Sequence, residues 1–546
     1  MTVQPVAGPR CDAGRQRAIS LLDLLDDAAT GRGTVHFIAD EPEPTRFSEL
    51  WDASEQAARW IAAKVGTGGV VAAVLTNTRP CVTALLGAWR AGCTVASLPL
   101  PARGMLAQVY AGQITRFCAA AGARTLLADP DHAPLLADTP LLVHTFDETL
   151  SGGPPSSFGG EGALVQFTSG SVGTPKGIHL TLDAVGANVV AIVAALDPVA
   201  GDGLCSWLPL SHDMGLIGQL LSPLAAGAPQ FGHVRLTLMK PDTFMANPRS
   251  WLRTCSQTGA TITVAPNFAL ELAVRTSRRI GSLDLSRLRA IIVGSEAVRA
   301  DTLERFADAF APAGFRPLSL CPGYGLAEAT VAVTIVRPHE PWHAIPRPAE
   351  HAAAAPGGAS RPLVSTGSPV DGVDVRVAAR DGRAGPIELR SPSLLSRYIG
   401  ADLSLTDDGY FVTGDIGVMH DGELFVIGRG DEAIVVAGRN VYPDDIESAV
   451  HHESIRRGCI AAVAAPDGGL AIVVEPSASS MSTPELETAC RGIRTAVASQ
   501  TGCPLATVAF VPRGSLPKTP SGKLRRLAIS RSLAADDGLL ARVNFG

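Results

Sequence analysis

The sequence predicts an α/β fold with parallel sheets, followed by a small β subdomain and a separate C-terminal domain. Three observations support this prediction. Short apolar strands alternate with helical segments as far as Val293, short strands with alternating polar residues follow, and a third pattern begins beyond Gly428. Alternation of strands and helices is typical of parallel sheets with crossover helices. The chain has 546 residues, which is enough for about three or four compact units.

The alternating region begins after a loose N-terminus. The spacing of apolar residues predicts helices at Thr45–Lys64, at Pro80–Ala91 and from about Asp183. Strands are predicted at Val70–Leu75, Thr94–Leu98, Leu164–Phe167, Thr261–Ala265 and Arg289–Val293. Ligands of such folds lie at the carboxyl ends of the strands. We therefore expect a ligand site near the loop at Thr168, near Gly294 and near Tyr324.

The later part of the chain divides into three regions. Residues Arg337–Pro362 include six prolines and predict a long irregular loop. Short alternating strands separated by Asp-Gly turns predict a β subdomain at about 363–428. A strand at Ala433–Val436, a turn through Gly438 and a helix beginning near Pro443 then predict a new domain. We place the N-terminal domain at 1–430 and the C-terminal domain at 431–546.

Composition limits the classes of protein that the chain can belong to. A net charge of −6 and a pI near 6.1 argue against a nucleic-acid-binding protein. The longest apolar run, Val189–Leu196, is too short to span a bilayer, and the first twenty residues lack the apolar core of a secretory signal. None of the ten cysteines forms a C-x-x-C pair. We therefore expect a cytoplasmic enzyme with reduced cysteines.

The stretch Leu164–Gly177 has the chemistry of a phosphate-binding loop. An apolar strand runs into a loop of glycines and hydroxyl residues that ends in a lysine; its candidate ligands are Thr168, Ser169, Gly170, Ser171, Gly173, Thr174 and Lys176. Glycines allow backbone N–H groups to converge on an anion, and the lysine adds a positive charge. The loop is not a Walker A motif, because Pro175 stands where its second glycine belongs. The structural alternative is a flexible turn between a strand and a helix.

Further motifs follow this loop in a fixed order. They are Trp207–Gly218, Ala265–Phe268, Tyr324–Thr330, Thr413–Asp415, Gly428–Arg429, Gly438–Pro443 and Pro517–Lys523. Together with the loop, they resemble the adenylate-forming superfamily of acyl-CoA synthetases, peptide-synthetase adenylation domains and luciferases. The branch that they resemble most is that of the fatty acyl-AMP ligases, and the resemblance extends from about Ser20 to Ser530.

This resemblance implies an architecture and a reaction. It implies two parallel-sheet α/β subdomains and a β subdomain in the N-terminal domain, and a small, mobile α+β C-terminal lid. The implied reaction uses ATP and Mg²⁺ to convert a carboxylic acid to acyl-AMP with release of pyrophosphate, and passes the acyl group to a carrier-protein phosphopantetheine. The alternatives are an acyl-CoA synthetase and a non-catalytic adenylate-binding or carrier-docking protein.

The same resemblance suggests the residues around the reacting groups. The Thr168 loop and Lys176 would hold the β- and γ-phosphates, and Glu328 would be the magnesium ligand; its structural alternative is a carboxylate at a helix start. Lys523 would bridge the substrate carboxylate and the α-phosphate. His212 would lie near the acyl carboxylate, although a histidine that serves only a local hydrogen bond is an alternative.

The remaining predicted positions surround the nucleoside and the acyl chain. Asp415 would accept hydrogen bonds from both ribose hydroxyls with assistance from Arg429, and Tyr324 would offer its ring to adenine. The adenine and ribose site would also include Gly294, Ser295, Glu296 and Gly325. The acyl pocket would include Met214, Pro266, Asn267 and Phe268, which leaves long-chain, polycyclic and aryl acids open. At the hinge, Asp431 and Glu432 replace the family's Lys-Asp pair.

Overall fold

The computed structural model describes most of the chain. The described residues are 20–38, 40–101, 105–154, 158–168, 176–277, 280–348, 351, 361–379, 382–436, 439–450, 453–465, 469–478, 481–501, 505–518, 524–535 and 543–545. Within these ranges, no helix has the length and apolar character needed to cross a membrane.

The first sheet has seven strands in the order β20-β8-β7-β4-β3-β5-β6. Its strands are β3 (Val70–Val74), β4 (Thr94–Leu98), β5 (Thr125–Ala128), β6 (Leu142–Thr145), β7 (Ala163–Thr168), β8 (Lys176–Thr181) and β20 (Arg397–Ile399). The five strands from β7 to β6 are parallel, whereas β8 is antiparallel to both β7 and β20. The strands predicted from Val70, Thr94 and Leu164 are confirmed.

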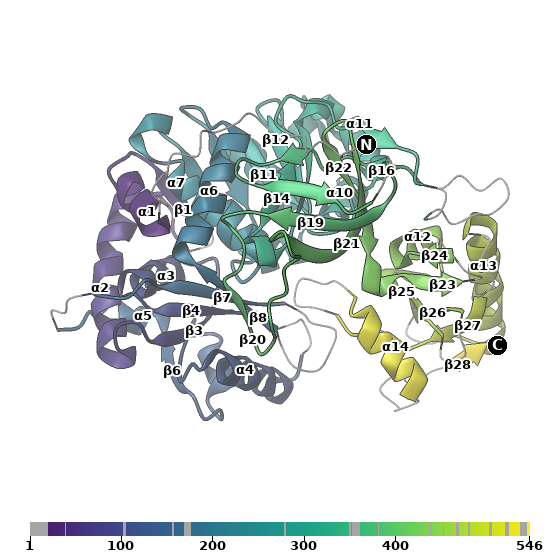
Figure 1. Cartoon of the computed structure of the whole chain (residues 1–546), viewed down its shortest axis with the longest axis horizontal. Helices are drawn as coiled ribbons and strands as arrows, with labels where there is room; N and C mark the ends of the chain where they lie inside the picture. The colour runs from purple at the N-terminus through teal and green to yellow at the C-terminus, as the bar shows by residue number, and fades with distance from the viewer. Residues whose placement is uncertain are drawn as a thin grey trace.

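Helices cover both faces of this sheet (Figure 1). Strand β3 illustrates the reason for this cover, since it carries apolar side chains on both faces and both must be buried. Val71 and Ala73 belong to the cluster that includes α2 (Phe47–Val65) and α3 (Arg79–Arg90). Ala72 and Val74 instead pack in the cluster of α4 (Ala107–Ala121). A strand buried on both faces is typical of parallel sheets in α/β proteins.

The second sheet has nine strands in the order β17-β14-β13-β12-β11-β9-β10-β1-β2. They are β1 (Thr34–Phe37), β2 (Thr45–Arg46), β9 (Gly203–Ser206), β10 (Arg235–Leu238), β11 (Ile262–Ala265), β12 (Ala290–Val293), β13 (Leu320–Gly325), β14 (Ala332–Ile335) and β17 (Ser368–Pro369). The strands from β13 to β1 run parallel. The predicted architecture of two parallel-sheet subdomains is therefore confirmed.

One apolar cluster joins the two sheets. It contains Leu164 of the first sheet, Ile262 of the second, and residues of α6 (Leu182–Leu196), η2 (Met214–Leu221) and α7 (Ser222–Ala225) between them. The opposite face of the second sheet packs against α9 (Arg249–Thr258), α10 (Asn267–Thr276) and α11 (Ala300–Phe310). The shorter helices are α1 (Leu21–Ala29), α5 (Phe146–Thr149) and α8 (Pro241–Ala246).

The predicted β region forms a four-stranded antiparallel sheet and also extends its neighbours. The four strands are β18 (Asp374–Val377), β19 (Gly385–Arg390), β21 (Phe411–His420) and β22 (Glu423–Arg429). Strands β17 and β20 of the same region join the two large sheets instead. Strand β16 (Leu363–Val364) pairs with β15 (Ala344–Ile345), so the segment Arg337–Pro362 contains a short strand where an irregular loop was predicted.

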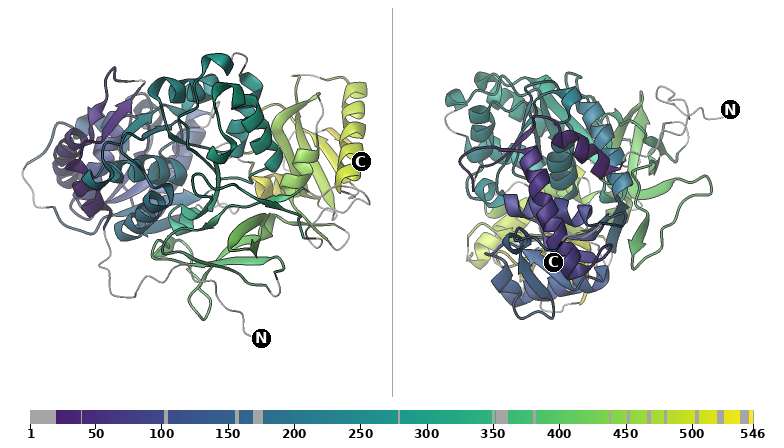
Figure 2. Two further views of the ribbon diagram at one scale, coloured as in Figure 1. Left: turned by 90° about the horizontal axis from the view of Figure 1, so that it is seen from above. Right: turned by 90° about the vertical axis from the view of Figure 1, so that its left-hand side faces the viewer.

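The last part of the chain forms a compact α+β unit beside the large sheets, as Figures 1 and 2 show. It contains β23 (Ile434–Val436), β24 (Arg439–Val441), α12 (Pro443–Ala449), β25 (Ile455–Ala464), β26 (Leu470–Pro476), α13 (Thr483–Thr501), β27 (Leu505–Phe510), α14 (Arg526–Ala535) and β28 (Val543–Phe545). Two apolar clusters consist of residues from Ile434 onward. Such separate cores are typical of an independent domain, and the boundary near residue 431 stays a prediction.

Candidate functional site

The predicted phosphate loop connects two strands of a hairpin. Strands β7 and β8 pair antiparallel, and their last register pair is Thr168 with Lys176. The loop therefore leads from a strand to a strand, and the alternative of a turn into a helix is wrong. The backbone of Thr168 and all of Lys176 are described, whereas Ser169, Gly170, Ser171, Gly173 and Thr174 lie outside the described residues. Lys176 begins β8 and is exposed.

A tyrosine connects Lys176 to the predicted magnesium ligand. The Nζ atom of Lys176 lies 5.5 Å from the centre of the Tyr398 ring. The Tyr398 hydroxyl donates a hydrogen bond of 3.1 Å to Oε1 of Glu328 in η7 (Ala327–Ala329). Strand β20 positions Tyr398 because it pairs with β8, which begins at Lys176. Our sequence reasoning missed Tyr398, since its three-residue strand carries no periodic signal.

Glu328 has the environment expected of a carboxylate that binds a cation. Burial raises its pKa, and the Tyr398 hydrogen bond and the charge of Arg429 oppose this rise, while nearby Asp213 adds to it. Within the described residues, no group of three His, Cys, Asp or Glu side chains could hold a metal alone. Mg²⁺ commonly binds through one or two carboxylates together with substrate phosphates and water. A single half-buried carboxylate, linked to Lys176 through Tyr398, fits that mode of binding.

A second group contains the residues predicted for the nucleoside. Asp415 of β21 stands opposite Arg429 at the end of β22, and Arg429 Nε lies 3.6 Å from Asp415 Oδ1. The Tyr324 hydroxyl donates to Asp415 Oδ2 at 2.6 Å. Burial raises the pKa of Asp415, whereas the Tyr324 hydrogen bond and Arg429 favour its ionised form. The structure thus brings together three residues that lie far apart in the sequence.

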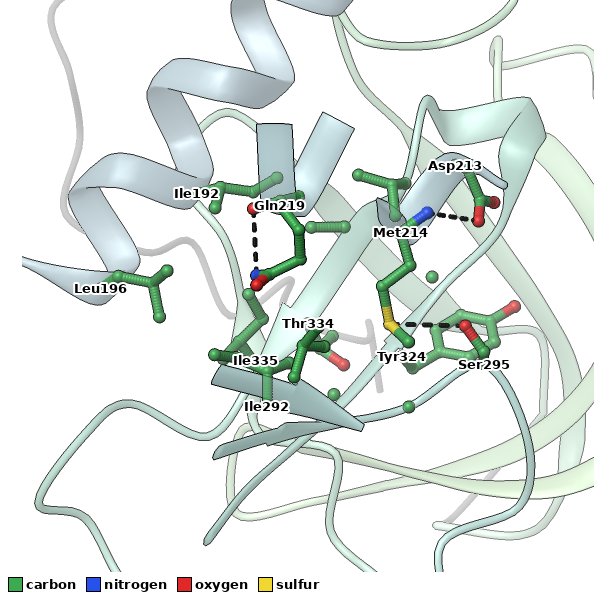
Figure 3. A pocket seen from close by; sticks show the side chains of 17 residues that line it. Ile192, Leu196, Asp213, Met214, Gln219, Ile292, Ser295, Tyr324, Thr334 and Ile335 are labelled. Carbon is green, nitrogen blue, oxygen red and sulfur yellow. Dashed lines mark hydrogen bonds between the residues drawn. The ribbon is translucent and has the colours of Figure 1, made fainter. Parts of the chain in front are cut away.

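A pocket begins beside this group and is enclosed mainly by apolar residues (Figure 3). About 600 Å³ of space that no atom fills lies here, and part of it is open to solvent. Five predicted residues line it: Met214, Gly294, Ser295, Tyr324 and Gly325. The other lining residues are Ile192, Leu196, Asp213, Gly218, Gln219, Val264, Ile292, Gly323, Val331, Ala332, Thr334 and Ile335.

The segment Pro266–Phe268, predicted for the acyl pocket, does not line this cavity. Asn267 is the first residue of α10, and its side chain accepts from the backbone N–H of Arg299. Phe268 packs its ring edge-on against Trp207 and donates its backbone N–H to Glu296 Oε1 at 2.5 Å. Glu296 therefore holds the start of α10 and lies outside the pocket lining. The Asn267 side chain thus contacts the start of α11, and that of Phe268 contacts Trp207.

His212 is held by its sequence neighbour. Its Nδ1 lies 2.5 Å from Asp213 Oδ1, and the same oxygen accepts the backbone N–H of Met214 at 2.6 Å. Asp213 lines the pocket, and His212 does not. This contact agrees with the structural alternative for His212, and its placement at the acyl carboxylate stays a prediction.

The two hinge residues are paired with arginines on either side of the hinge. In η9 (Gly430–Glu432), Asp431 pairs with Arg429 at 3.2 Å and Glu432 pairs with Arg526 at 2.8 Å. Arg526 also pairs with Glu447 at 2.8 Å and with Asp444. Lys523 lies outside the described residues. Our sequence reasoning assigned no role to Arg526, whose side chain is 18% exposed among these carboxylates.

The proline-rich segment contacts the C-terminal domain. Arg347 Nη2 donates to Asp445 Oδ1 at 3.0 Å, with only 8% and 16% of their side chains exposed. Ile345 packs in a cluster that includes Tyr442, whereas Trp342 packs against the core of the second sheet. Of these two apolar residues, Ile345 lies at the contact between the domains.

Comparisons with known proteins agree on one family. Residues 25–399 match the family model described as AMP-binding enzyme. The chain is 33% identical over 417 residues to the long-chain-fatty-acid–AMP ligase FadD26 of Mycobacterium marinum, covering 68% of this chain and 70% of that one. It is 34% identical over 400 residues to the medium-chain-fatty-acid–[acyl-carrier-protein] ligase JamA of Moorena producens, covering 67% of each.

A solved structure from work on fatty acyl-adenylate ligases of E. coli and L. pneumophila is similar along nearly the whole chain. Its TM-score is 0.85 at 25% identity, with 95% of this chain and 98% of that chain covered.

Proposed function

The chain belongs to the family of AMP-binding enzymes, and from this premise we propose that it is a fatty acyl-AMP ligase. In this proposal, ATP and Mg²⁺ activate a carboxylic acid to acyl-AMP with release of pyrophosphate. The observation that carries the proposal is the contact from Lys176 through Tyr398 to Glu328, beside a mainly apolar pocket. This arrangement offers a cation, a carboxylate and a mainly apolar pocket.

The residues act on the main obstacle to the reaction, which is negative charge. A carboxylate must attack the α-phosphorus while pyrophosphate leaves, so cations and oriented donors lower the barrier. Lys176 neutralises the β- and γ-phosphates, and Asp415 accepts the ribose hydroxyls while Tyr324 and Arg429 hold its carboxylate. Mg²⁺, when bound at Glu328 and the phosphates, would supply further charge neutralisation. Lys523 would add a positive charge at the reacting carboxylate.

We further propose that a carrier-protein phosphopantetheine receives the acyl group. The relative JamA is named as a ligase to an acyl-carrier protein. In this chain the proline-rich segment contacts the C-terminal domain through Arg347 and Ile345. A contact that favours one domain orientation disfavours rotation to another. We expect this restraint to hinder the use of CoA as acceptor.

Pyrophosphate exchange across a panel of carboxylic acids tests the activity. We expect exchange that depends on an added acid, and loss of exchange in Lys176→Ala. Absence of exchange with every acid would instead support a non-catalytic adenylate-binding protein.

Product analysis with CoA and with a carrier protein tests the acceptor. We expect acyl-AMP and acyl-carrier product with little acyl-CoA, and more acyl-CoA after deletion of Glu340–Ser360. Rapid acyl-CoA synthesis by the intact enzyme would identify an acyl-CoA synthetase.

We also propose a cytoplasmic location. The eight described cysteines are all free and buried, as is common in proteins of reducing compartments. Detection of the enzyme in a periplasmic or secreted fraction would contradict this proposal.

A further inference from the structure

The wall of the acyl pocket contains one buried amide. Gln219 lies in η2, a π-helical segment, and only 2% of it is exposed. In a π-helix, hydrogen bonds join residues five apart, so Met214 and Gln219 come to lie on nearly the same face. Both therefore line the pocket. Figure 3 shows Gln219 near Ile192, Leu196 and Ile335, away from the side where Tyr324 lies.

The orientation of this amide is set by its own backbone. Nε2 of Gln219 donates to the carbonyl oxygen of Gly218 at 3.2 Å, and a carbonyl can only accept. The other atom of the amide is therefore the oxygen, and Oε1 is buried without a hydrogen-bond partner. A buried polar atom without a partner is rare in a folded protein and needs an explanation.

The surroundings of Gln219 make a ligand the natural partner for this oxygen. Among the side chains near it, Ile192, Leu196 and Ile335 are apolar, and the Thr334 hydroxyl already donates to Thr366 Oγ1 at 2.9 Å. The polar residues at the other side are engaged as well. Tyr324 donates to Asp415, and Ser295 donates to the sulfur of Met214 at 3.4 Å.

We propose that the acid activated by this enzyme carries a hydroxyl on its distal part, and that this hydroxyl donates a hydrogen bond to Oε1 of Gln219. This inference rests on the proposed function and names the substrate class. An acyl chain made of carbon alone would exclude water from this end of the pocket and leave the oxygen unpaired. Sites built to pair with a substrate hydroxyl discriminate strongly against analogues that lack it. The hydroxyl could be aliphatic or phenolic, and the experiment below distinguishes these two classes of acid.

The test compares matched acids in pyrophosphate exchange. One series pairs straight-chain alkanoic acids with their ω-hydroxy counterparts, and the other pairs phenylalkanoic with 4-hydroxyphenylalkanoic acids. For the wild type we expect kcat/KM to be higher for the hydroxylated member of at least one pair, by about tenfold or more. The pair with the larger ratio identifies the hydroxyl as aliphatic or phenolic.

Two variants assign the preference to Gln219. Gln219→Leu keeps the approximate size of the side chain and removes the acceptor, so the ratio should fall to about one or below. Leu196→Met is the matched control, because it reshapes the same end of the pocket without adding a polar group and should change both acids alike. Should Gln219→Leu fail to fold in a thermal unfolding assay, calorimetric affinities of the wild type for each matched pair decide the question.

Two results would overturn the inference: equal use of hydroxylated and plain acids by the wild type, or a preference that persists in Gln219→Leu. Exchange with none of the acids would be a different result, because it would remove the proposed function and this inference together.

Discussion

Replacing Asp415 gives the sharpest test of the nucleoside site. Its carboxylate is 12% exposed and sits between the Tyr324 hydroxyl and Arg429. If it accepts the ribose hydroxyls, it binds ATP equally in the ground state and the transition state. Asp415→Ala should therefore raise the KM for ATP and leave kcat nearly unchanged.

The size of the effect follows from the contacts that are lost. A hydrogen bond to a charged group contributes about 1.5–3 kcal/mol, which corresponds to an increase in KM of about 10- to 150-fold. The alanine variant also leaves the hydroxyl of the partly buried Tyr324 without its acceptor, which should cost about 1–3 kcal/mol of stability. Asp415→Asn keeps an acceptor oxygen for Tyr324, so this variant should be more stable than Asp415→Ala. It should still weaken ATP binding, because the negative charge is lost.

The measurement is ATP titration by calorimetry together with pyrophosphate exchange at varied ATP. Tyr324→Phe is the matched control, because it removes the hydroxyl and keeps both the ring and the Asp415 carboxylate. A similar KM increase in Tyr324→Phe would mean that Asp415 acts mainly by holding Tyr324. Unchanged ATP affinity in Asp415→Ala would refute the ribose assignment.

Three further predictions concern charge and domain contact. Lys523→Ala should slow acyl-AMP formation by about 10²- to 10³-fold while calorimetry shows nearly normal ATP binding; a loss below about tenfold contradicts the assigned role. Tyr398→Phe removes a hydrogen bond that favours ionised Glu328, whose pKa burial already raises. The acid limb of the pH–rate profile should therefore move to higher pH, and a shift to lower pH would contradict this reasoning. Arg347→Ala breaks the ion pair with Asp445 and should raise the ratio of acyl-CoA to acyl-carrier product, with Arg347→Lys as the control; an unchanged ratio excludes a restraining role.

Local sequence patterns predicted much of the fold. The strand Thr94–Leu98 has the predicted bounds, because its apolar run follows Gly92 and ends before Pro99. The hairpin after the phosphate loop was not predicted, since Lys176–Thr181 gains its strand character from pairing with β7 and β20. Pairing with a distant strand leaves little trace in a short sequence window.

The site residues divide in the same way. Residues within motifs, such as Asp415 and Tyr324, could be selected from the sequence, and the structure brings them into contact. Tyr398 and Arg526 could not, because their surroundings are made by residues distant in the chain. Gln219 lies in the apolar run Met214–Leu221, so the sequence gives no sign that it has a role in the pocket. The π-helical geometry of η2 places it on the pocket side.

The pairing of β8 with β20 also affects how the protein is made. His179 and Ser396, which hydrogen-bond where these strands meet, are 217 residues apart. At a synthesis rate of about 5–20 residues per second, the ribosome adds β20 roughly 10–40 s after β8. The outer edge of β8 stays unpaired until then. An unpaired strand edge can pair with another chain during that time. Tyr398 is part of the same late strand, so its contacts with Lys176 and Glu328 form only when this pairing protects the edge.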